Sequence, residues 1–509
     1  MSDDSPEAHR SPEAGSSADV SPSPESRSGL SPFEKAELPS PPRPKGLAWI
    51  GVVGPGVIVL GASIGSGEFL LGPAAFVQYG LVLLWVTLVA AFLQTVFNTE
   101  LMRWTLATGE PVVTGFMRTK PWAPLWAFFY AILYFLQVGW PGWAGAAAGA
   151  IYFLIFRELA GPEQAQLVYW IGVGTFAVCV GVLLFGKRIA RTLELLNWVL
   201  VAAILGGFLV LALAFVSADT WVAAGAGLVG YDPGAGSFRF IPEGVDWFLI
   251  GAFAAYSGAG GVINLTLSNW ARDKGYGMGK RAGHIPAAVG GERTDLAPTG
   301  YTFDTDSAAM NRWRGWWRVV RADQWGVYFV GAMLGMILPA VLYVTFIESG
   351  TDIRGLSVAA ALANAMASQA GAIFGGAIAL IGVWVLFKTQ LDIIEAMTRA
   401  ITDILWTGSG WVRRLRGGDV RFLYYTVLGL LAVWGVIALK LAQPIFLLQL
   451  GANMAGIVFV VSSLHLLYIN TRFLPEAVRP PMWRRIALVA MSVFYGAFVV
   501  LWLRGQFGG

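Results

Sequence analysis

The feature that most constrains this chain is the recurrence of long apolar runs separated by short polar connections. Each run is close to or above the roughly 20 residues that a helix needs to cross a bilayer core of about 30 Å. Of the 509 residues, 56% are hydrophobic and 13% are charged, whereas soluble proteins carry about 25% charged residues. Because lipid offers the backbone no hydrogen-bond partners, such runs must be helical. We therefore expect an all-α polytopic membrane protein with eleven transmembrane helices, near residues 47–71, 79–102, 125–156, 168–186, 194–217, 245–270, 324–347, 370–398, 422–440, 443–469 and 484–503.

Residues 1–45 differ from the rest, because Ser, Pro and Glu dominate them. Such a segment cannot bury enough apolar surface to offset its conformational entropy, so we expect a disordered cytoplasmic tail. It has no apolar core of a signal peptide, so the first span must direct insertion itself. The single cysteine, Cys179, excludes a disulfide or a cysteine metal cluster within one chain.

Basic residues alternate between the connections. The segment before the first span and the loops after the even-numbered spans are rich in Lys and Arg, whereas the loops after the third, fifth and seventh spans carry only Arg157, Arg239 and Arg354. Lys- and Arg-rich connections stay in the cytoplasm. The pattern predicts a multi-pass protein of the plasma (inner) membrane, with its N-terminus cytoplasmic and its C-terminus outside.

Two spans carry glycine clusters that a plain membrane anchor does not need. The first contains GASIGSGE and the sixth contains AYSGAGGVINLT. Glycine-interrupted spans at matching positions in two five-span halves are typical of inverted-repeat transporters, and unwound backbone at membrane depth exposes groups that bind ions or polar solutes. The alternative interpretation is close helix packing at small residues. The predicted substrate-binding residues here are Gly65, Ser66, Gly67, Glu68, Tyr256, Ser257, Gly258, Gly260, Gly261 and Asn264.

The same halves predict the domain organisation. A transporter domain is expected over residues 46–505, with a first repeat at 46–217 and a second at 245–470. A cytoplasmic loop at 271–322 interrupts the second repeat, and 484–503 forms an extra span. The Trp- and Arg-rich end of the loop predicts a helix at the lipid headgroups rather than a nucleic-acid site.

Several motifs resemble the Nramp (natural resistance-associated macrophage protein) family of divalent-metal transporters, over about residues 47–505. The resemblance implies a leucine-transporter-like 5+5 inverted repeat with broken spans 1 and 6, an eleventh span and alternating access. It also implies that Gln449 approaches the substrate; the alternative interpretation of Gln449 is a polar contact between helices. The matching residues are Gly54-Pro55-Gly56, YGLVLLW at 79–85, Gln94, Thr108-Gly109, Glu194 and LAQPIFLLQL in span 10.

The departures from the family fall at the expected metal site. Where the family has Asp-Pro-Gly-Asn, this chain has Gly-Ser-Gly-Glu at 65–68, and Gly261, Val262 and Ile263 stand where the family has Met-Pro-His. Soft ligands help to select transition metals, whereas oxygen ligands suit hard ions such as Mg²⁺. The resemblance therefore implies Glu68 as the metal ligand of an oxygen-lined site.

Span 8 carries an unusual number of polar residues for a membrane helix. Lys388 and Asp392 are four residues apart, as are Glu395 and Arg399, so each pair shares a helix face. Gln390 lies between them. Two structural ion pairs are one interpretation, and a coupling-ion or gating role for Lys388, Gln390, Asp392 and Glu395 is the other.

These observations favour a secondary transporter that moves a divalent cation, Mg²⁺-like or Mn²⁺. A proton or another ion is the expected coupling partner. One alternative is a transporter of an amino acid or small organic solute held by the Gly-Ser-Gly amides; another is a non-transporting sensor with the same fold. No catalytic triad, phosphate loop or metal-hydrolase motif is present in the sequence. We therefore expect no enzyme, no cofactor and no nucleic-acid partner, but close contact with the lipid bilayer.

Overall fold

Long helices account for most of the computed structural model, which describes residues 29–185, 189–286, 296–297, 299–353, 358–441 and 443–507. Within these residues, ten helices are long and apolar enough to cross a membrane, judged by length and composition. They are α2 with η3 and α3 (Pro55–Ser63, Ile64–Leu71, Gly72–Tyr79), η4 with α4 (Leu81–Leu83, Leu84–Thr108), α6 with α7 (Ala123–Val138, Gly142–Phe156), η5 with α8 (Pro162–Gln164, Ala165–Val182), α9 (Ile189–Phe215), α14 with η6 and α15 (Ser307–Arg321, Ala322–Phe329, Val330–Phe346), α17 (Ala372–Gly408), α19 (Val420–Ala438), α20 (Pro444–Arg472) and α21 (Met482–Phe507).

The remaining predicted span, the sixth, is divided into α11 (Trp247–Tyr256) and α12 (Val262–Lys274). Each piece is too short to cross a bilayer alone, and together they complete the eleven expected segments. The first span begins later than the predicted residue 47. Pro55 starts α2 because its fixed φ suits the first helical turn, and the chain before it forms only short turns, with Leu47 85% exposed.

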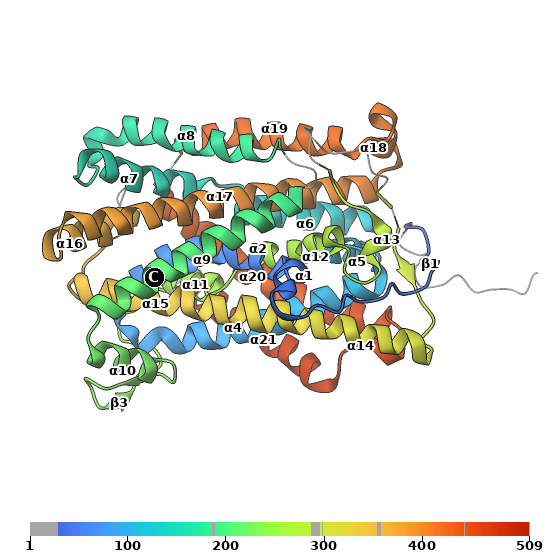
Figure 1. Cartoon of the computed structure of the whole chain (residues 1–509), viewed down its shortest axis with the longest axis horizontal. Helices are drawn as coiled ribbons and strands as arrows, with labels where there is room; N and C mark the ends of the chain where they lie inside the picture. The colour runs from blue at the N-terminus through green and yellow to red at the C-terminus, as the bar shows by residue number, and fades with distance from the viewer. Residues whose placement is uncertain are drawn as a thin grey trace, which may run out of the picture.

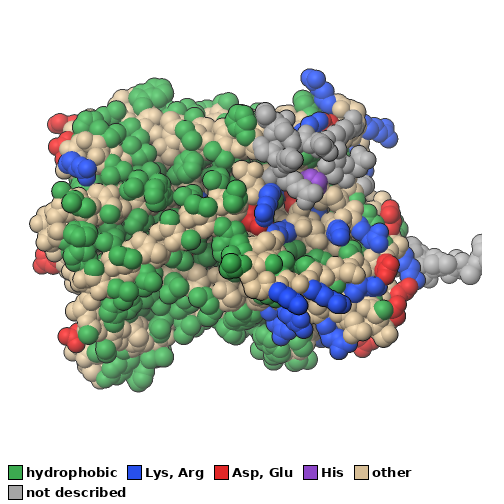
Figure 2. Space-filling view, viewed as in Figure 1, with side chains coloured by type: hydrophobic (Ala, Val, Ile, Leu, Met, Phe, Trp, Pro, Cys, Tyr) green, Lys and Arg blue, Asp and Glu red, His purple; other side chains and the backbone are tan. Residues whose placement is uncertain are grey.

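Several of the shorter elements lie at the two ends of the helical layers. In Figure 1, α10, β3 and α16 are at the left-hand end, whereas β1, α13, α14 and α18 are at the right-hand end. Lys and Arg side chains gather at the same right-hand end in Figure 2. The short elements are β1 (Glu34–Lys35), η2 (Gly46–Ala48), α1 (Trp49–Val52), α5 (Val112–Met117), α10 (Ala218–Gly227), β2 (Tyr231–Asp232), β3 (Ser237–Phe238), α13 (Gly279–Ala282), β4 (Tyr301–Thr302), η7 (Val358–Ala360), α16 (Ala361–Gln369), α18 (Gly410–Arg414), η8 (Leu415–Gly417) and η9 (Glu476–Val478).

Span 1 lies near the centre of the molecule in Figure 1, and it is buried from Pro55 to Val77. Its predicted interruption takes a different form from the one expected. Residues Ile64–Leu71 form a π-helix between two α-helices, so the chain stays helical through Gly65. A π-helix widens the turn by one residue and often marks a functional site, but its backbone groups remain hydrogen bonded. The expected unwinding of span 1 is therefore wrong. The residues predicted to unwind are nevertheless the ones that depart from the regular α-helix.

The segment before span 1 also differs from expectation. β1 pairs in parallel with β4 of the loop after span 6, and Leu38 is only 1% exposed. The indole of Trp316 donates a hydrogen bond of 2.8 Å to the carbonyl of Pro39. The prediction of disorder is wrong for residues 29–45, which lie against the loop and α14, and residues 1–28 lie outside the described residues.

Helix α14 continues through η6 into α15, so the Trp- and Arg-rich segment belongs to the same long helix as span 7. Trp313 and Trp316 are buried against protein: Trp313 packs on Phe303 and Trp316 on Tyr276. The expectation of indole rings in the lipid interface is wrong for these two residues, because the docked N-terminal segment and β4 cover them.

Candidate solute site between spans 1 and 6

Three glycines form the gap between α11 and α12. Gly258, Gly260 and Gly261 have φ values of 126°, 81° and 49°, a region that side-chain-bearing residues rarely adopt. The predicted interruption of span 6 is confirmed at these residues. Its carbonyl and N–H groups lie inside the protein and need partners from other helices.

Gln137 of α6 supplies one set of partners. Its Nε2 donates to the carbonyl oxygen of Gly260 at 2.8 Å, and its Oε1 accepts from the N–H of Val262 at 2.9 Å. A single amide thus replaces the helical hydrogen bonds on both sides of the gap.

Gln94 of α4 and Tyr328 of η6 supply the other set. Gln94 Nε2 donates to the Ser257 carbonyl at 3.2 Å, and the Tyr328 hydroxyl donates to Gln94 Oε1 at 3.0 Å. The same hydroxyl accepts from the N–H of Ala259 at 3.1 Å. Spans 2, 3 and 7 therefore hold the broken backbone of span 6 in place.

Glu68 is fully buried in the π-helical segment. Ser63, one turn earlier, donates its hydroxyl proton to Oε1, while Oε2 has no hydrogen-bond partner among the described residues. The side chain packs toward α15, where a Cβ built on Gly335 would lie 3.5 Å from Glu68 Cγ. Burying a carboxylate oxygen without a donor is costly, so this free oxygen is a place for a cation or a donor group.

Glycines let span 1 approach its neighbours at this level. A Cβ at Gly67 would lie 1.7 Å from the carbonyl oxygen of Tyr256, and one at Gly65 would lie 2.3 Å from Thr389 Oγ1. One turn earlier, a Cβ at Gly61 would collide with Asn197 Oδ1. The π-helix of span 1 is thus in direct contact with the broken end of α11.

The remaining predicted residues surround this contact. Ser66 Oγ accepts from the indole of Trp143 at 2.9 Å, and Ser257 Oγ donates to the Phe253 carbonyl at 2.8 Å. Asn264, in the first turn of α12 after the gap, donates from Nδ2 to Asn98 Oδ1 at 2.8 Å. The amide nitrogen of Gln449, which is also buried, has no partner among the described residues.

Lys388 and Asp392 form the first of the two ion pairs expected in span 8. Both side chains are fully buried, and their charged atoms are 3.3 Å apart. Asn197 of α9 joins them, with Oδ1 accepting from Lys388 at 3.1 Å and Nδ2 donating to Asp392 at 2.9 Å. The ammonium of Lys388 lies against Gly61 of span 1 and is close enough to Glu68 for their charges to attract.

The structure separates the other two span-8 candidates from this group. Gln390 Oε1 accepts from the N–H of Ala144 at 3.1 Å and so faces span 3. Glu395 forms the second expected pair with Arg399, at 2.5 Å, and accepts from the Trp270 indole at 2.8 Å. Glu395 therefore lies beside α12, nearer the basic end of the molecule.

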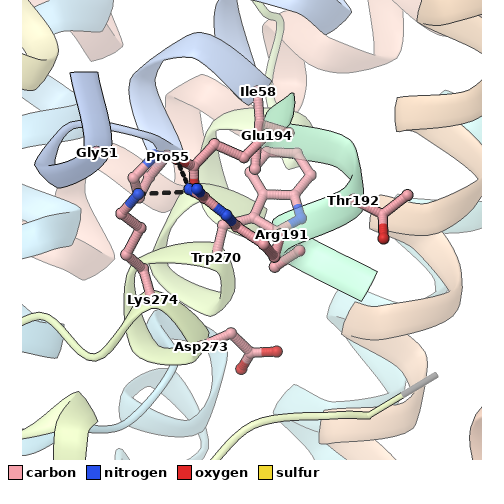
Figure 3. Close-up of a pocket in the computed structure, with 10 residues that line it drawn as sticks. Gly51, Pro55, Ile58, Arg191, Thr192, Glu194, Trp270, Asp273 and Lys274 are labelled. Atoms are coloured by element: carbon pink, nitrogen blue, oxygen red, sulfur yellow. Dashed lines mark hydrogen bonds and ion pairs between the residues drawn. The ribbon is translucent and has the colours of Figure 1, made fainter. Parts of the chain in front are cut away.

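A cavity of about 510 Å³ opens at that end between spans 1, 5 and 6. Pro55 and Ile58 of span 1 line it together with Trp270 of α12. Figure 3 shows Glu194 between Lys274, 2.7 Å away, and Arg191, 2.6 Å away. Ile58 lies one turn of helix before the Gly61 level, so this cavity points toward Lys388 and, beyond it, Glu68.

The chemistry of the site is that of a single free carboxylate oxygen with hydroxyl, amide and backbone oxygens nearby. Among the described residues, no three His, Cys, Asp or Glu side chains converge into a metal-binding group. A dehydrated transition metal would have too few ligands here, whereas Mg²⁺ retains several waters and binds through one or two carboxylates.

Sequence reasoning missed several residues that hold the site together. Gln94 was noted only as a motif residue, and Asn197, Tyr328, Ser63 and Thr389 were not singled out. Asn197 had an available signal as a lone amide within an apolar run, and Gln94 had one together with Asn98 in span 2, because polar residues inside spans are often functional. Tyr328 and Thr389 had none, because such residues are common in membrane helices.

Comparison with known proteins identifies the fold. No family model matches the chain, and no curated protein matches it either. Among solved structures, a crystal structure of a variant of the manganese transporter from Eremococcus coleocola has a TM-score of 0.60 at 15% identity, covering 94% of this chain and 91% of that one. The same transporter in complex with an aromatic bis-isothiourea compound has a TM-score of 0.57 at 15% identity, with 94% and 92% coverage. At this identity the likeness establishes the fold, and the chain therefore has the architecture of an Nramp-type manganese transporter, as its motifs predicted.

Proposed function

We propose that this protein is a secondary transporter that moves a divalent metal cation across the membrane by alternating access. The observation that carries the proposal is Glu68, a fully buried carboxylate with a free oxygen, on a π-helical turn in contact with the broken span 6. Manganese transporters with the same fold support it. The cation binds at Glu68, and the helices around it rearrange to open the site to each side in turn.

The ligand set favours a hard, partly hydrated ion. One carboxylate oxygen and neutral oxygens suit Mg²⁺, or Mn²⁺ with its waters, better than a site requiring thioether or imidazole ligands. The amino-acid alternative depended on free amides at Gly65–Gly67, but these residues lie inside a π-helix. No observation favours the sensor alternative, and the cation transporter remains the proposal.

Lys388, Asp392 and Asn197 are proposed to couple this site to the basic end of the molecule. They lie between Glu68 and the level of the cavity, and a cation arriving at Glu68 competes with the Lys388 ammonium for the same negative charge. The cavity lined by Ile58 and Glu194 is the proposed cytoplasmic exit, which agrees with the excess of basic residues at that end.

Replacing the carboxylate tests the proposal. Glu68→Gln keeps the shape but removes the charge, so flux of Mg²⁺ and Mn²⁺ into liposomes should fall at least tenfold, since losing a charge-assisted interaction costs about 1.5–3 kcal/mol. The measurement is uptake by the purified protein over a panel of Mg²⁺, Mn²⁺, Ca²⁺ and small organic solutes.

Glu163→Gln is the matched control, because Glu163 is exposed in η5 at the start of span 4. It should transport like the unchanged protein. Flux of an organic solute in the absence of any metal flux would contradict the proposal, as would full metal flux by Glu68→Gln.

A further inference from the structure

One face of α14 carries a row of arginines at the end of the molecule where spans 2, 7 and 11 meet. Arg314, Arg318 and Arg321 are exposed and follow the i, i+4, i+7 spacing of a single helix face. The opposite face buries Trp313 and Trp316. Among the described residues no carboxylate pairs with the three guanidinium groups, although Arg314 donates to Asn311 at 2.5 Å.

Beside this row lies a buried cluster with unbalanced charge. Glu100 accepts from Arg103 at 2.7 Å and from Arg484 at 2.9 Å, so two cations share one carboxylate. Trp317 of α14 lies between them, with guanidinium carbons 4.3 Å and 5.0 Å from its ring. Arg321 is also close enough to Arg484 for their positive charges to repel each other. The cluster therefore adds positive charge to the arginine face rather than neutralising it.

Apolar side chains at the start of α21 mark the level of the lipid. Met482 is 65% exposed, Trp483 is 50% exposed and Ile486 is 61% exposed. Arg484 lies over the Trp483 ring, at 4.5 Å. An exposed indole next to exposed aliphatic groups is typical of the headgroup boundary of a bilayer. In Figure 2, Lys and Arg side chains gather over α14 at the lower right, beside exposed hydrophobic ones.

We propose that the arginine face of α14 and the start of α21 bind an anionic phospholipid. The headgroup phosphate lies against Arg318 and Arg321, and the acyl chains run along Met482 and Ile486. Guanidinium groups bind phosphate oxygens through paired hydrogen bonds, and basic residues at the membrane surface are attracted to anionic lipid. Because α14 is continuous with span 7, which holds the gap in span 6 through Tyr328, a bound lipid is attached to a helix that supports the solute site.

Lipid binding by the purified full-length protein tests this. Native mass spectrometry and thermal unfolding in neutral detergent would compare added phosphatidylglycerol with phosphatidylcholine. Phosphatidylglycerol should be retained and should raise the melting temperature, and high salt should weaken its effect. In Arg318→Gln/Arg321→Gln, affinity for phosphatidylglycerol should fall about fivefold per arginine, roughly 25-fold in all.

The matched control is Arg414→Gln/Arg416→Gln, which removes two exposed arginines near α18. It should bind phosphatidylglycerol like the unchanged protein. Equal binding of the two lipids would overturn the proposal, as would an equal loss in the control variant. Binding of a soluble polyanion such as heparin without binding of phosphatidylglycerol would assign the face to an acidic macromolecule instead, and would also overturn it.

Discussion

Single atoms decide how closely span 1 approaches the helices around it. At Gly67 the neighbouring group is the Tyr256 carbonyl, part of the backbone and unable to swing away. At Gly61 the neighbours are side chains, Asn197 and Lys388. The glycines that first suggested an unwound helix serve close contact instead, which is the alternative interpretation of small residues in membranes, while Glu68 among them is buried with an oxygen left free.

Gly67→Ala should therefore destabilise the protein. Its Cβ would lie 1.7 Å from a backbone oxygen, and overpacking of this kind costs about 1–3 kcal/mol or more. The melting temperature and the folded yield in detergent should both fall. Gly174→Ala is the control, because a Cβ there meets nothing within 4 Å, and it should leave the melting temperature unchanged. Equal behaviour of the two variants would contradict the contact.

The buried pair in span 8 allows structure and function to be separated. Lys388→Met or Asp392→Leu alone leaves an unpaired buried charge and should cost about 3–5 kcal/mol, whereas the double variant should recover most of that stability. Thermal unfolding measures the first part, and metal flux by the stable double variant measures the second. Normal flux would show that the pair is structural only, and lost flux in a folded protein would support its coupling role.

At the scale of elements, the two central spans depart from a regular α-helix in different ways. Span 6 is broken by three left-handed glycines, and its free backbone groups bind Gln94, Gln137 and Tyr328. Span 1 keeps its hydrogen bonds by widening into a π-helix. The π-helix therefore presents a side chain, Glu68, to the site, and span 6 presents backbone.

Gln137→Leu tests how the gap is held. The substitution removes the donor to the Gly260 carbonyl and the acceptor from the Val262 N–H. Each buried group left without a partner costs about 1–3 kcal/mol. The free energy of unfolding should fall by roughly 2–6 kcal/mol, measured by denaturant titration in detergent. Gln166→Leu, at an exposed position in α8, is the control and should have little effect. A Gln137→Leu protein of unchanged stability would mean that water replaces the amide.

At the scale of the whole molecule, charge is distributed unevenly between the two ends. The right-hand end in Figures 1 and 2 carries α13, α14 and most of the visible basic side chains. The 510 Å³ cavity opens at this end, and α10, which carries Asp219, lies at the other end in Figure 1. A cytoplasmic location of the basic end remains a prediction from the positive-inside rule.

Cysteine labelling would test that orientation. Cys179 is buried, so a Cys179→Ala background should be tolerated. In intact cells a membrane-impermeant maleimide should label Asp219→Cys but not Arg191→Cys, which is exposed at the cavity, and in inside-out vesicles the preference should reverse. Labelling of Arg191→Cys from outside intact cells would contradict the predicted topology, whatever the transported solute.

The sequence by itself determined the membrane class, the eleven helical segments and the gap in span 6, because apolar length and glycine clustering act locally. It also placed Glu68 inside the membrane. Only the tertiary structure decided that span 1 stays helical, that residues 29–45 dock, and that Gln94, Gln137 and Asn197 hold the site. These contacts join residues more than a hundred positions apart, as Gln94 and Ser257 show. No local pattern specifies such partners, because they depend on which helices pack side by side and at what depth.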